Sequence, residues 1–284
     1  WGGFTLAVLA CFVVGDRVAM TEPGYAAYRN ILEAFGVEVV PIPVGSDSGF
    51  NLSIEQLEAA GALAGVVVAS PSNPTGTVIS DAEMRRLASF CSTAGLRLIS
   101  DEIYHGITFG ATEVCALDYD NEAVVVQSFS KYQSMTGWRL GWMFVPDDLV
   151  DPVERLAQNL FISSPAISQH AALGSLEASD ELERHVTRYR TNRDLIISGV
   201  AAMDVHRVAP PDGAFYVWAD IGDFGLDSSE LCRRWLDDIG VAVTPGIDFD
   251  RTAGDRFVRF SYSESTAAVE AAFARLRSWV SRNR

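Results

Sequence analysis

Short apolar runs alternate with amphipathic stretches along the first half of the chain. The apolar runs have the length of buried strands and lie at 17–21, 37–43, 65–70, 97–101, 123–128 and 141–145. Helical patterns lie between several of them, at 26–35, 54–60 and 81–94. Ser80 stands at an N-cap position with Asp81 and Glu83 in the turn that follows, so the last of these helices is predicted to begin at residue 81.

This alternation predicts the fold class. Strand-length runs separated by helices are typical of right-handed βαβ crossovers, which place neighbouring strands parallel to one another. We therefore predict an α/β fold in three layers, with a mainly parallel sheet covered by helices on both faces. Ligands bind such sheets at the carboxyl ends of the strands, so the residues that directly follow each run are the candidate site residues.

The second half of the chain has a different pattern. From 177 to 202 it is one long polar stretch of helical character, rich in Glu, Arg and Asp. Shorter strand-like runs follow at 214–219, 241–244 and 256–260, with helical patterns at 229–239 and 266–282. We predict a large domain at 1–176, a long interdomain helix at 177–202 and a smaller α+β domain at 203–284.

Charge and hydropathy limit the partners. The 284 residues carry a formal net charge of −15, which argues against nucleic acid and anionic membranes, because both bind basic patches. The apolar segment at 1–10 lacks the basic flank of a signal peptide and is too short to cross a bilayer, so we expect a buried helix. Because the chain begins within this run and without methionine, we interpret it as a fragment.

The cysteines show no paired spacing. Cys11, Cys91, Cys115 and Cys232 are scattered along the chain, and no two of them form a CxxC pair. With no CxxC pair and no nearby histidine, the pattern favours buried thiols in a reduced, cytoplasmic protein over a disulfide framework or a zinc site. A catalytic cysteine is the weaker interpretation, since free cysteines are mostly core residues.

Lysine occurs only once, at Lys131, among 22 lysines and arginines. Nucleotide bias can replace lysine with arginine wherever only positive charge is needed. A position that keeps lysine then points to an amine that must lose its proton, either to act as a nucleophile or to form a Schiff base.

The neighbours of Lys131 suit a phosphorylated aldehyde. Lys131 follows the run at 123–128, with Ser128 three residues before it and Arg139 eight residues after it. The amine can form the imine while the hydroxyl and the guanidinium bind the phosphate. A surface lysine beside an ordinary turn is the alternative, and the string as a whole favours the cofactor site.

Two further polar strings follow strand-like runs. Within 100–104, the Asp101 carboxylate could pair with a protonated pyridine nitrogen and the Tyr104 hydroxyl could reach a phenolic oxygen. An N-cap aspartate before a packed tyrosine explains that string equally well. Within 70–76, Asn73 offers an amide and Gly76 permits a positive φ, although such a cluster taken alone is more typical of a plain loop.

With these strings in this order, the chain resembles the class I/II aminotransferases, fold-type I pyridoxal 5′-phosphate enzymes of the aspartate aminotransferase superfamily. The resemblance runs from Phe4 to near the C-terminus. Its specificity lies in the co-occurrence of Asn73-Pro74-x-Gly76, Asp101-x-x-Tyr104 and Ser128-x-x-Lys131 followed by Gly137-Trp138-Arg139.

The resemblance implies roles for these residues. Lys131 would bind the cofactor covalently and later move the substrate proton, and Asp101 would pair with the pyridine nitrogen. The phenolic oxygen would accept hydrogen bonds from Asn73 and Tyr104. The phosphate would be bound by Ser128 and Arg139.

Two more positions match the family. Tyr25, in Glu22-Pro23-Gly24-Tyr25, stands where the family places an aromatic ring that stacks on the pyridine; a core tyrosine is the alternative. Arg259 matches the arginine whose planar fork binds the substrate α-carboxylate, and Asn73 is a second residue that the resemblance implies for substrate binding. The implied reaction transfers an amino group from an L-amino acid to a 2-oxo acid, in a homodimer.

The resemblance also leaves alternatives open. The same residues serve a C–S β-lyase or a decarboxylase, and an aminotransferase-like module can sense the cofactor for an attached DNA-binding region. The family usually carries about 100 further residues before this point, a length within normal domain sizes. That region holds part of the small domain and most of the phosphate-binding loop, of which Gly2 and Gly3 remain. Which amino acid is used does not follow from these residues.

Overall fold

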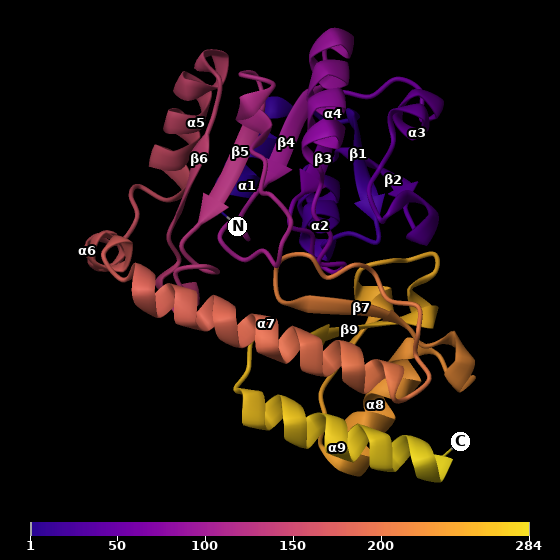
Figure 1. Ribbon diagram of the computed structural model, residues 1–284. Coiled ribbons are helices and arrows are strands. Elements are labelled where there is room, and N and C mark those ends of the chain that lie inside the picture. The colour runs from indigo at the N-terminus through magenta and orange to yellow at the C-terminus, as the bar shows by residue number, and fades with distance from the viewer. Residues whose placement is uncertain (1, 284) are drawn as a thin grey trace.

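The computed structural model of the chain describes residues 2–283. Two sheets organise it, a larger one built from the first half of the chain and a smaller one built from the second half. The long helix α7 (Ser179–Ala201) crosses the molecule from α6 (Ala166–Leu176) to the smaller sheet, as Figure 1 shows.

The larger sheet has six strands in the order β2-β1-β3-β4-β5-β6, of which the first five are parallel and β6 is antiparallel to β5. Its strands are β1 Arg17–Glu22, β2 Glu38–Pro43, β3 Gly65–Ala69, β4 Arg97–Asp101, β5 Val124–Ser128 and β6 Gly141–Phe144. The other helices of this half are α1 Gly2–Cys11, α2 Ala26–Ala34, α3 Ile54–Ala59, α4 Asp81–Ala94 and α5 Asp147–Leu160.

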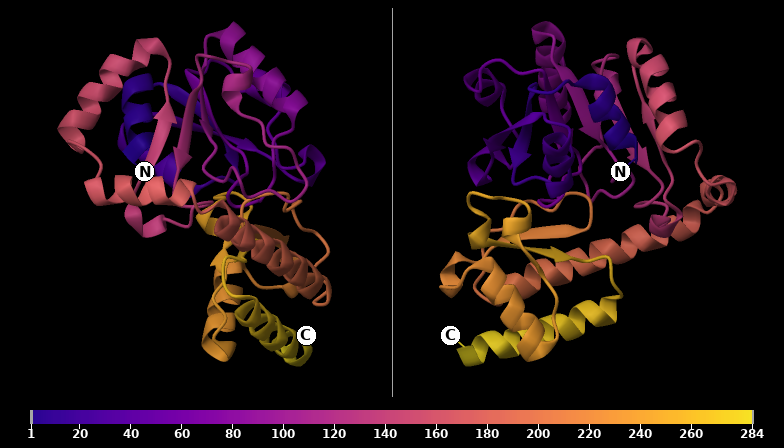
Figure 2. Two further views of the ribbon diagram at one scale, coloured as in Figure 1. Left: turned by 60° about the vertical axis from the view of Figure 1, so that its left-hand side comes forward. Right: turned by 180° about the vertical axis from the view of Figure 1, so that it is seen from behind.

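Helices cover both faces of this sheet. Successive side chains of a strand point to opposite faces, and in β3 Val66 and Val68 pack into a cluster with Met84 of α4. Val67 between them packs into a second cluster with Phe4 of α1. Helix α4 therefore lies on one face and α1, α2 and α5 lie on the other (Figure 2). Burial on both faces explains why the strands are continuous apolar runs.

The carboxyl ends of the parallel strands face the smaller sheet (Figure 1). The chain first adds β2 on one side of β1 and then crosses back to add β3 on the other side. The order of the strands therefore changes direction at β1. A sheet of this kind opens a crevice at such a point, because the connections on its two sides leave in opposite directions. The segments that follow β1, β3, β4 and β5 all border this crevice.

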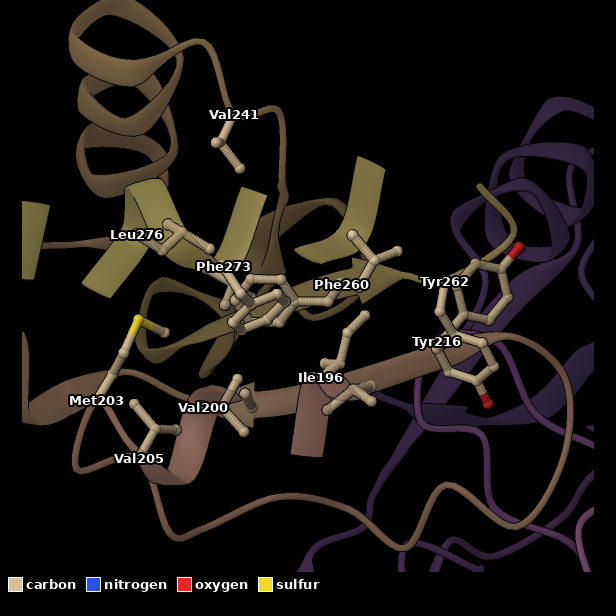
Figure 3. Close-up of a cluster of buried hydrophobic side chains, with 14 of the residues drawn as sticks. Ile196, Val200, Met203, Val205, Tyr216, Val241, Phe260, Tyr262, Phe273 and Leu276 are labelled. Atoms are coloured by element: carbon tan, nitrogen blue, oxygen red, sulfur yellow. The ribbon is translucent and has the colours of Figure 1, made fainter. Parts of the chain in front are cut away.

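The smaller sheet is antiparallel, in the order β7-β9-β8. Its strands are β7 Tyr216–Asp220, β8 Thr244–Pro245 and β9 Phe257–Ser261, and α8 Ser228–Ile239 and α9 Thr266–Asn283 complete this part. Its core joins Ile196 of α7 to Phe260 of β9 and Phe273 of α9. Figure 3 shows this cluster, with Tyr216 at one end of it.

The sequence predictions are confirmed for most elements. The helix at 81–94 and the strand at 97–101 have the predicted bounds, and Ser80 caps α4 by accepting a hydrogen bond from the Glu83 amide. The apolar segment at 1–10 is the helix α1, with residue 1 outside the described residues. The prediction of a full strand at 241–244 is wrong, because only Thr244 and Pro245 pair with β9.

Two helices have no counterpart in the predictions. Pro152 lies inside α5 and interrupts its helical pattern in the sequence, although Leu149 and Val153 form an apolar face that packs against the core. Helix α6 exposes Ile167, Leu173 and Leu176 and shows no clear apolar stripe. The division at residues 177 and 203 into two domains and a connecting helix stays a prediction.

The contact between α7 and α9 generates a stability prediction. A Cβ added to Gly199 of α7 would lie 2.2 Å from Cδ1 of Phe273. Gly199→Ala is therefore expected to lower the free energy of unfolding by about 1–3 kcal/mol, since the helices must move apart or Phe273 must leave its rotamer.

The matched control is Gly174 in the exposed part of α6, where an added Cβ meets open space. Gly174→Ala is expected to stabilise the fold by less than about 1 kcal/mol, through helix propensity. Urea denaturation compares the two variants. Equal effects would contradict the close packing of α7 on α9.

Candidate active site

A cavity of about 1320 Å³ lies between the carboxyl edge of the larger sheet and the smaller sheet. The lining includes every site residue predicted from the sequence: Tyr25, Asn73, Asp101, Tyr104, Ser128, Lys131, Arg139 and Arg259. The first seven come from the last residues of β4 and β5 and from the segments after β1, β3, β4 and β5, and Arg259 comes from β9. The fold thus gathers into one place residues that are scattered over most of the chain.

Lys131 is the reactive amine of this cavity. Its Nζ lies 5.3 Å from the ring centroid of Tyr104 and 5.6 Å from that of Phe215. Burial lowers the pKa of Lys131, and the charges of Arg259 and Arg139 lower it further, while Asp101 acts in the opposite direction. A lowered pKa makes the neutral, nucleophilic amine more accessible near neutral pH.

Asp101, the last residue of β4, lies buried at the base of the cavity. Its Oδ2 accepts a hydrogen bond from the Tyr28 hydroxyl, and its Oδ1 accepts one from the Ile103 amide at 3.1 Å. Burial raises the pKa of this carboxyl group, and the two hydrogen bonds oppose the rise. Turn residues and not a helix follow Asp101 directly, so the N-cap interpretation of this string is wrong.

Arg259 spans the cavity from the smaller sheet. Its Nη1 donates to Asn73 Oδ1 at 2.7 Å and its Nη2 to Thr244 Oγ1 at 3.3 Å. The guanidinium lies 4.2 Å from the ring centroid of Tyr216 and 4.6 Å from that of Phe249. Its Nε is buried without a hydrogen-bond partner, and no carboxylate among residues 2–283 forms a salt bridge with it.

The turn after β3 sets the position of Asn73. Gly76 closes this turn at a φ of +74°, as the sequence predicted, and a Cβ there would lie 2.9 Å from the Tyr216 carbonyl oxygen. The backbone of this turn consequently lies directly against the smaller sheet. Asn73, 5% exposed, is held where it can face both the cavity and Arg259.

Tyr104 is buried beside a second tyrosine. Its hydroxyl lies 2.9 Å from the Tyr216 hydroxyl, and the two rings meet edge to face. Burial raises the pKa of both phenols, so both remain neutral at ordinary pH. A neutral phenol keeps its proton for donation, which is what the proposed contact with a phenolic oxygen requires.

The other end of the cavity suits an anion. Arg139, exposed at a φ of +52°, and Ser128 line it together with Gly2 and Gly3 at the N-terminus of α1. Arg139 Nη1 donates to the Thr136 carbonyl oxygen at 2.8 Å, which leaves further donors of its fork for a ligand. Guanidinium, hydroxyl and a helix N-terminus are the donors that proteins use for phosphate.

Two residues of the site were not assigned from the sequence. Tyr28 lies three residues after Tyr25, near the start of α2, and a tyrosine on a helix face is ordinarily a packing residue. Tyr216 follows Phe215 in a run that carried no assigned role. Their partners, Asp101 and Tyr104, are 73 and 112 residues away, so no local pattern links them.

Among residues 2–283, no helix is both long and apolar enough to cross a membrane. The four cysteines are free thiols, with Cys91 and Cys232 buried and Cys11 and Cys115 half-buried.

Comparison with known proteins gives one consistent result. A sequence model of the class I and II aminotransferases matches residues 2–276. A valine–pyruvate aminotransferase from Mycobacterium tuberculosis is 49% identical, over 98% of this chain and 73% of its own length. An arginine–pyruvate transaminase from Pseudomonas aeruginosa is 36% identical, over 87% of this chain and 65% of its own length. The chain thus spans about two thirds to three quarters of these relatives.

Solved structures agree with this result. The crystal structure of an aminotransferase from Mycobacterium tuberculosis superposes with a TM-score of 0.97 at 48% identity, covering 99% of this chain and 74% of its own. Thermus thermophilus aspartate aminotransferase with maleate superposes with a TM-score of 0.91 at 28% identity, covering 98% and 73%.

The environment of Lys131 generates a prediction that needs no ligand. Because the chain has one lysine, reductive methylation with ¹³C-formaldehyde labels only Lys131 and the N-terminus. Carbon NMR is expected to give a Lys131 midpoint below the ordinary lysine value of 10.5.

Arg139→Gln should raise this midpoint, because it removes a nearby positive charge. Arg155→Gln, at an exposed position of α5, is the control and should leave the midpoint unchanged. A midpoint at or above 10.5 in the unaltered chain would contradict the burial of the amine.

Proposed function

Since the chain belongs to the class I and II aminotransferases and is therefore an aminotransferase, we propose that it works with pyridoxal 5′-phosphate bound covalently to Lys131. The observation that carries this proposal is the position of the single lysine. Its half-buried amine, with a lowered pKa, lies in one cavity with a buried carboxyl group and an anion-binding end.

The residues of the cavity fit this cofactor. Lys131 would bind its aldehyde carbon, Asp101 its ring nitrogen, and Ser128 and Arg139 its phosphate. Asn73 and Tyr104 would donate to its phenolic oxygen, and Tyr25 would lie against its ring. When bound, the cofactor supplies an electron sink that stabilises negative charge at the substrate α-carbon.

Asp101 and Lys131 have complementary tasks. The Asp101 carboxylate would hold a proton on the ring nitrogen, and the hydrogen bond from Tyr28 keeps that carboxylate oriented. Lys131, once displaced by the substrate amine, would remove the proton from the substrate α-carbon and return a proton to the former aldehyde carbon of the cofactor. A depressed pKa suits an amine that must act as a base near neutral pH.

Arg259 would bind the α-carboxylate of the substrate. The Arg259 side chain is half-buried, and its guanidinium contacts only neutral groups. These are the side-chain oxygens of Asn73 and Thr244 and two aromatic rings. A carboxylate would supply the missing anion and meet the guanidinium through two parallel hydrogen bonds. The substrate would thereby be oriented with its α-carbon toward Lys131, on the opposite side of the cavity.

We further propose neutral amino acids as donors and pyruvate as the acceptor. Two other arginines of the cavity are already paired, Arg29 with Glu22 at 3.7 Å and Arg251 with Glu33 at 2.9 Å. A second carboxylate on the substrate would have to compete with these glutamates. The valine–pyruvate and arginine–pyruvate relatives support pyruvate as acceptor.

A homodimer in the cytoplasm is the proposed form of the enzyme. Large apolar side chains are exposed on α5, α6 and the segment between them: Leu160, Phe161, Ile162, Ile167 and Leu173. Exposed apolar surface of this kind is typical of protein interfaces, and Phe161 and Ile162 also line the cavity. Sedimentation velocity of the cofactor-loaded chain measures this, and a monomer at micromolar concentration would contradict it.

The assignment of Lys131 is tested by substitution. The unaltered chain with pyridoxal phosphate is expected to give an absorbance band that borohydride removes, leaving a cofactor adduct on Lys131 in the mass spectrum. Lys131→Ala should lose the adduct and lower transamination by about 10⁴-fold or more. Lys131→Arg keeps the charge and should be equally inactive. Transamination retained by either variant would overturn the role of Lys131.

The substrate proposal is tested by rates of single half-reactions. Valine is expected to bleach the cofactor band faster than aspartate, and pyruvate is expected to restore it faster than 2-oxoglutarate. Arg251→Gln is not expected to reverse this order, because Arg251 already pairs with Glu33. The reverse order in the unaltered chain would contradict the proposal, and pyruvate released from a cysteine-like donor without an acceptor would instead indicate β-elimination.

A further inference from the structure

Tyr216 connects the two halves of the active site. It is 6% exposed at the start of β7, and its hydroxyl lies 2.9 Å from that of Tyr104, which lies in the turn after β4 of the larger sheet. Its ring lies 4.2 Å from the guanidinium carbon of Arg259, which belongs to the smaller sheet. Figure 3 shows Tyr216 at the end of the cluster, with its hydroxyl directed away from the aliphatic side chains.

The sheet geometry fixes this arrangement. Strands β7 and β9 are antiparallel, and Trp218 pairs directly with Arg259. Tyr216 is two residues before Trp218, so it lies on the same face as Arg259, at a diagonal position within reach of long side chains. The contact therefore follows from the register of the two strands.

We propose that Tyr216 is a positioning residue for the reaction. Its hydroxyl donates to the Tyr104 hydroxyl and so leaves the Tyr104 proton for the phenolic oxygen of the cofactor, and its ring couples this contact to Arg259. This inference rests on the proposed function, because it assumes that the cofactor is bound at Lys131.

The direction of the hydrogen bond follows from counting donors. Each phenol has one proton to donate, and burial raises the pKa of both, so both are neutral. If Tyr104 donates to the cofactor, Tyr216 must be the donor within the pair. Successive hydrogen bonds in the same direction polarise one another, so Tyr216 makes Tyr104 a stronger donor.

Arg259 controls the strength of this donor. Its positive charge lowers the pKa of Tyr216 against the larger effect of burial, and a more acidic phenol donates a stronger hydrogen bond. A substrate carboxylate on Arg259 would cancel that charge and weaken the donation through Tyr216 and Tyr104. The nitrogen that joins Lys131 to the cofactor should then become more basic when a carboxylate binds.

Other groups near Tyr216 and Lys131 also affect the pKa values of these two side chains. Arg259 acts on Tyr216, and Tyr216 in turn acts on Tyr25. Asp101 and Arg139, together with Arg259, act on Lys131. Replacing Tyr216 with Phe leaves all of them in place, so a change in the titration of that nitrogen would come from the single hydroxyl group.

The experiment is a spectrophotometric pH titration of the cofactor band of the loaded enzyme, which reports the proton on that nitrogen and not activity. Tyr216→Phe is expected to raise the midpoint by about half a unit, because the phenolic oxygen loses part of its stabilisation. Tyr104→Phe should raise it more. In the double variant, loss of the Tyr216 hydroxyl should add nothing to the effect of Tyr104→Phe.

A carboxylate without an amino group tests the coupling. Isovalerate should raise the midpoint of the unaltered enzyme, and it should raise that of Tyr216→Phe by less. Tyr189→Phe is the matched control, because Tyr189 is a buried tyrosine of the same cluster that packs on Phe215. The midpoint of the cofactor band in the Tyr189→Phe enzyme should equal that of the unaltered enzyme.

The failures of the two proposals are distinguishable. If the unaltered chain forms no borohydride-sensitive band at Lys131, the proposed function fails and this inference fails with it. If the band forms but Tyr216→Phe titrates like the unaltered enzyme, the inference alone is overturned. Additive shifts in the double variant, or an equal shift in Tyr189→Phe, would also overturn it by showing a merely structural effect.

Discussion

The hydrogen bond from Arg259 to Asn73 is the interaction on which the active site depends. It joins residues 186 positions apart and connects β9 of the smaller sheet to the turn after β3 of the larger one. Arg259 reaches this position with neutral partners only, since oxygens of Asn73 and Thr244 and the rings of Tyr216 and Phe249 surround its guanidinium. A cation kept among neutral groups favours binding of an anion, which supports the proposed role of Arg259 in binding the substrate carboxylate.

Burial shifts the pKa values of Asp101 and Lys131, which share this cavity, in opposite directions. It raises the pKa of Asp101 and lowers that of Lys131, because a low dielectric disfavours both charged forms. Each group also moderates the other, since the Asp101 charge raises the pKa of Lys131 and the Lys131 charge lowers that of Asp101. The amine can therefore lose its proton more easily, and a carboxyl group lies in the same cavity, as the proposed binding of the cofactor requires.

A second layer of phenols supports these groups. Tyr28 donates to Asp101 from α2, and Tyr216 meets Tyr104 from β7. Both phenols come from elements that pack against the carboxyl edge of the large sheet, where the parallel strands end together. The supporting hydroxyls are buried in the same cores that hold the fold together, so packing and orientation of the catalytic groups are enforced by the same contacts.

The sequence by itself determined the three-layer fold and the identity of the first contacts. Strands buried on both faces are continuous apolar runs, and Lys131, Asp101 and Asn73 stand in local strings whose spacing carries the chemistry. Helix α6 and the contacts of the Tyr28 and Tyr216 hydroxyls were decided only by the tertiary structure, whereas α5 has an apolar face that Pro152 obscures in the sequence. A helix without an apolar stripe, such as α6, is positioned by the elements around it. Tyr104 and Tyr216 meet across 112 residues because strand register and the packing of the smaller sheet near the larger one bring them together. Hydrophobic periodicity extends over one helix or strand, so it cannot indicate a contact between residues so far apart in the sequence.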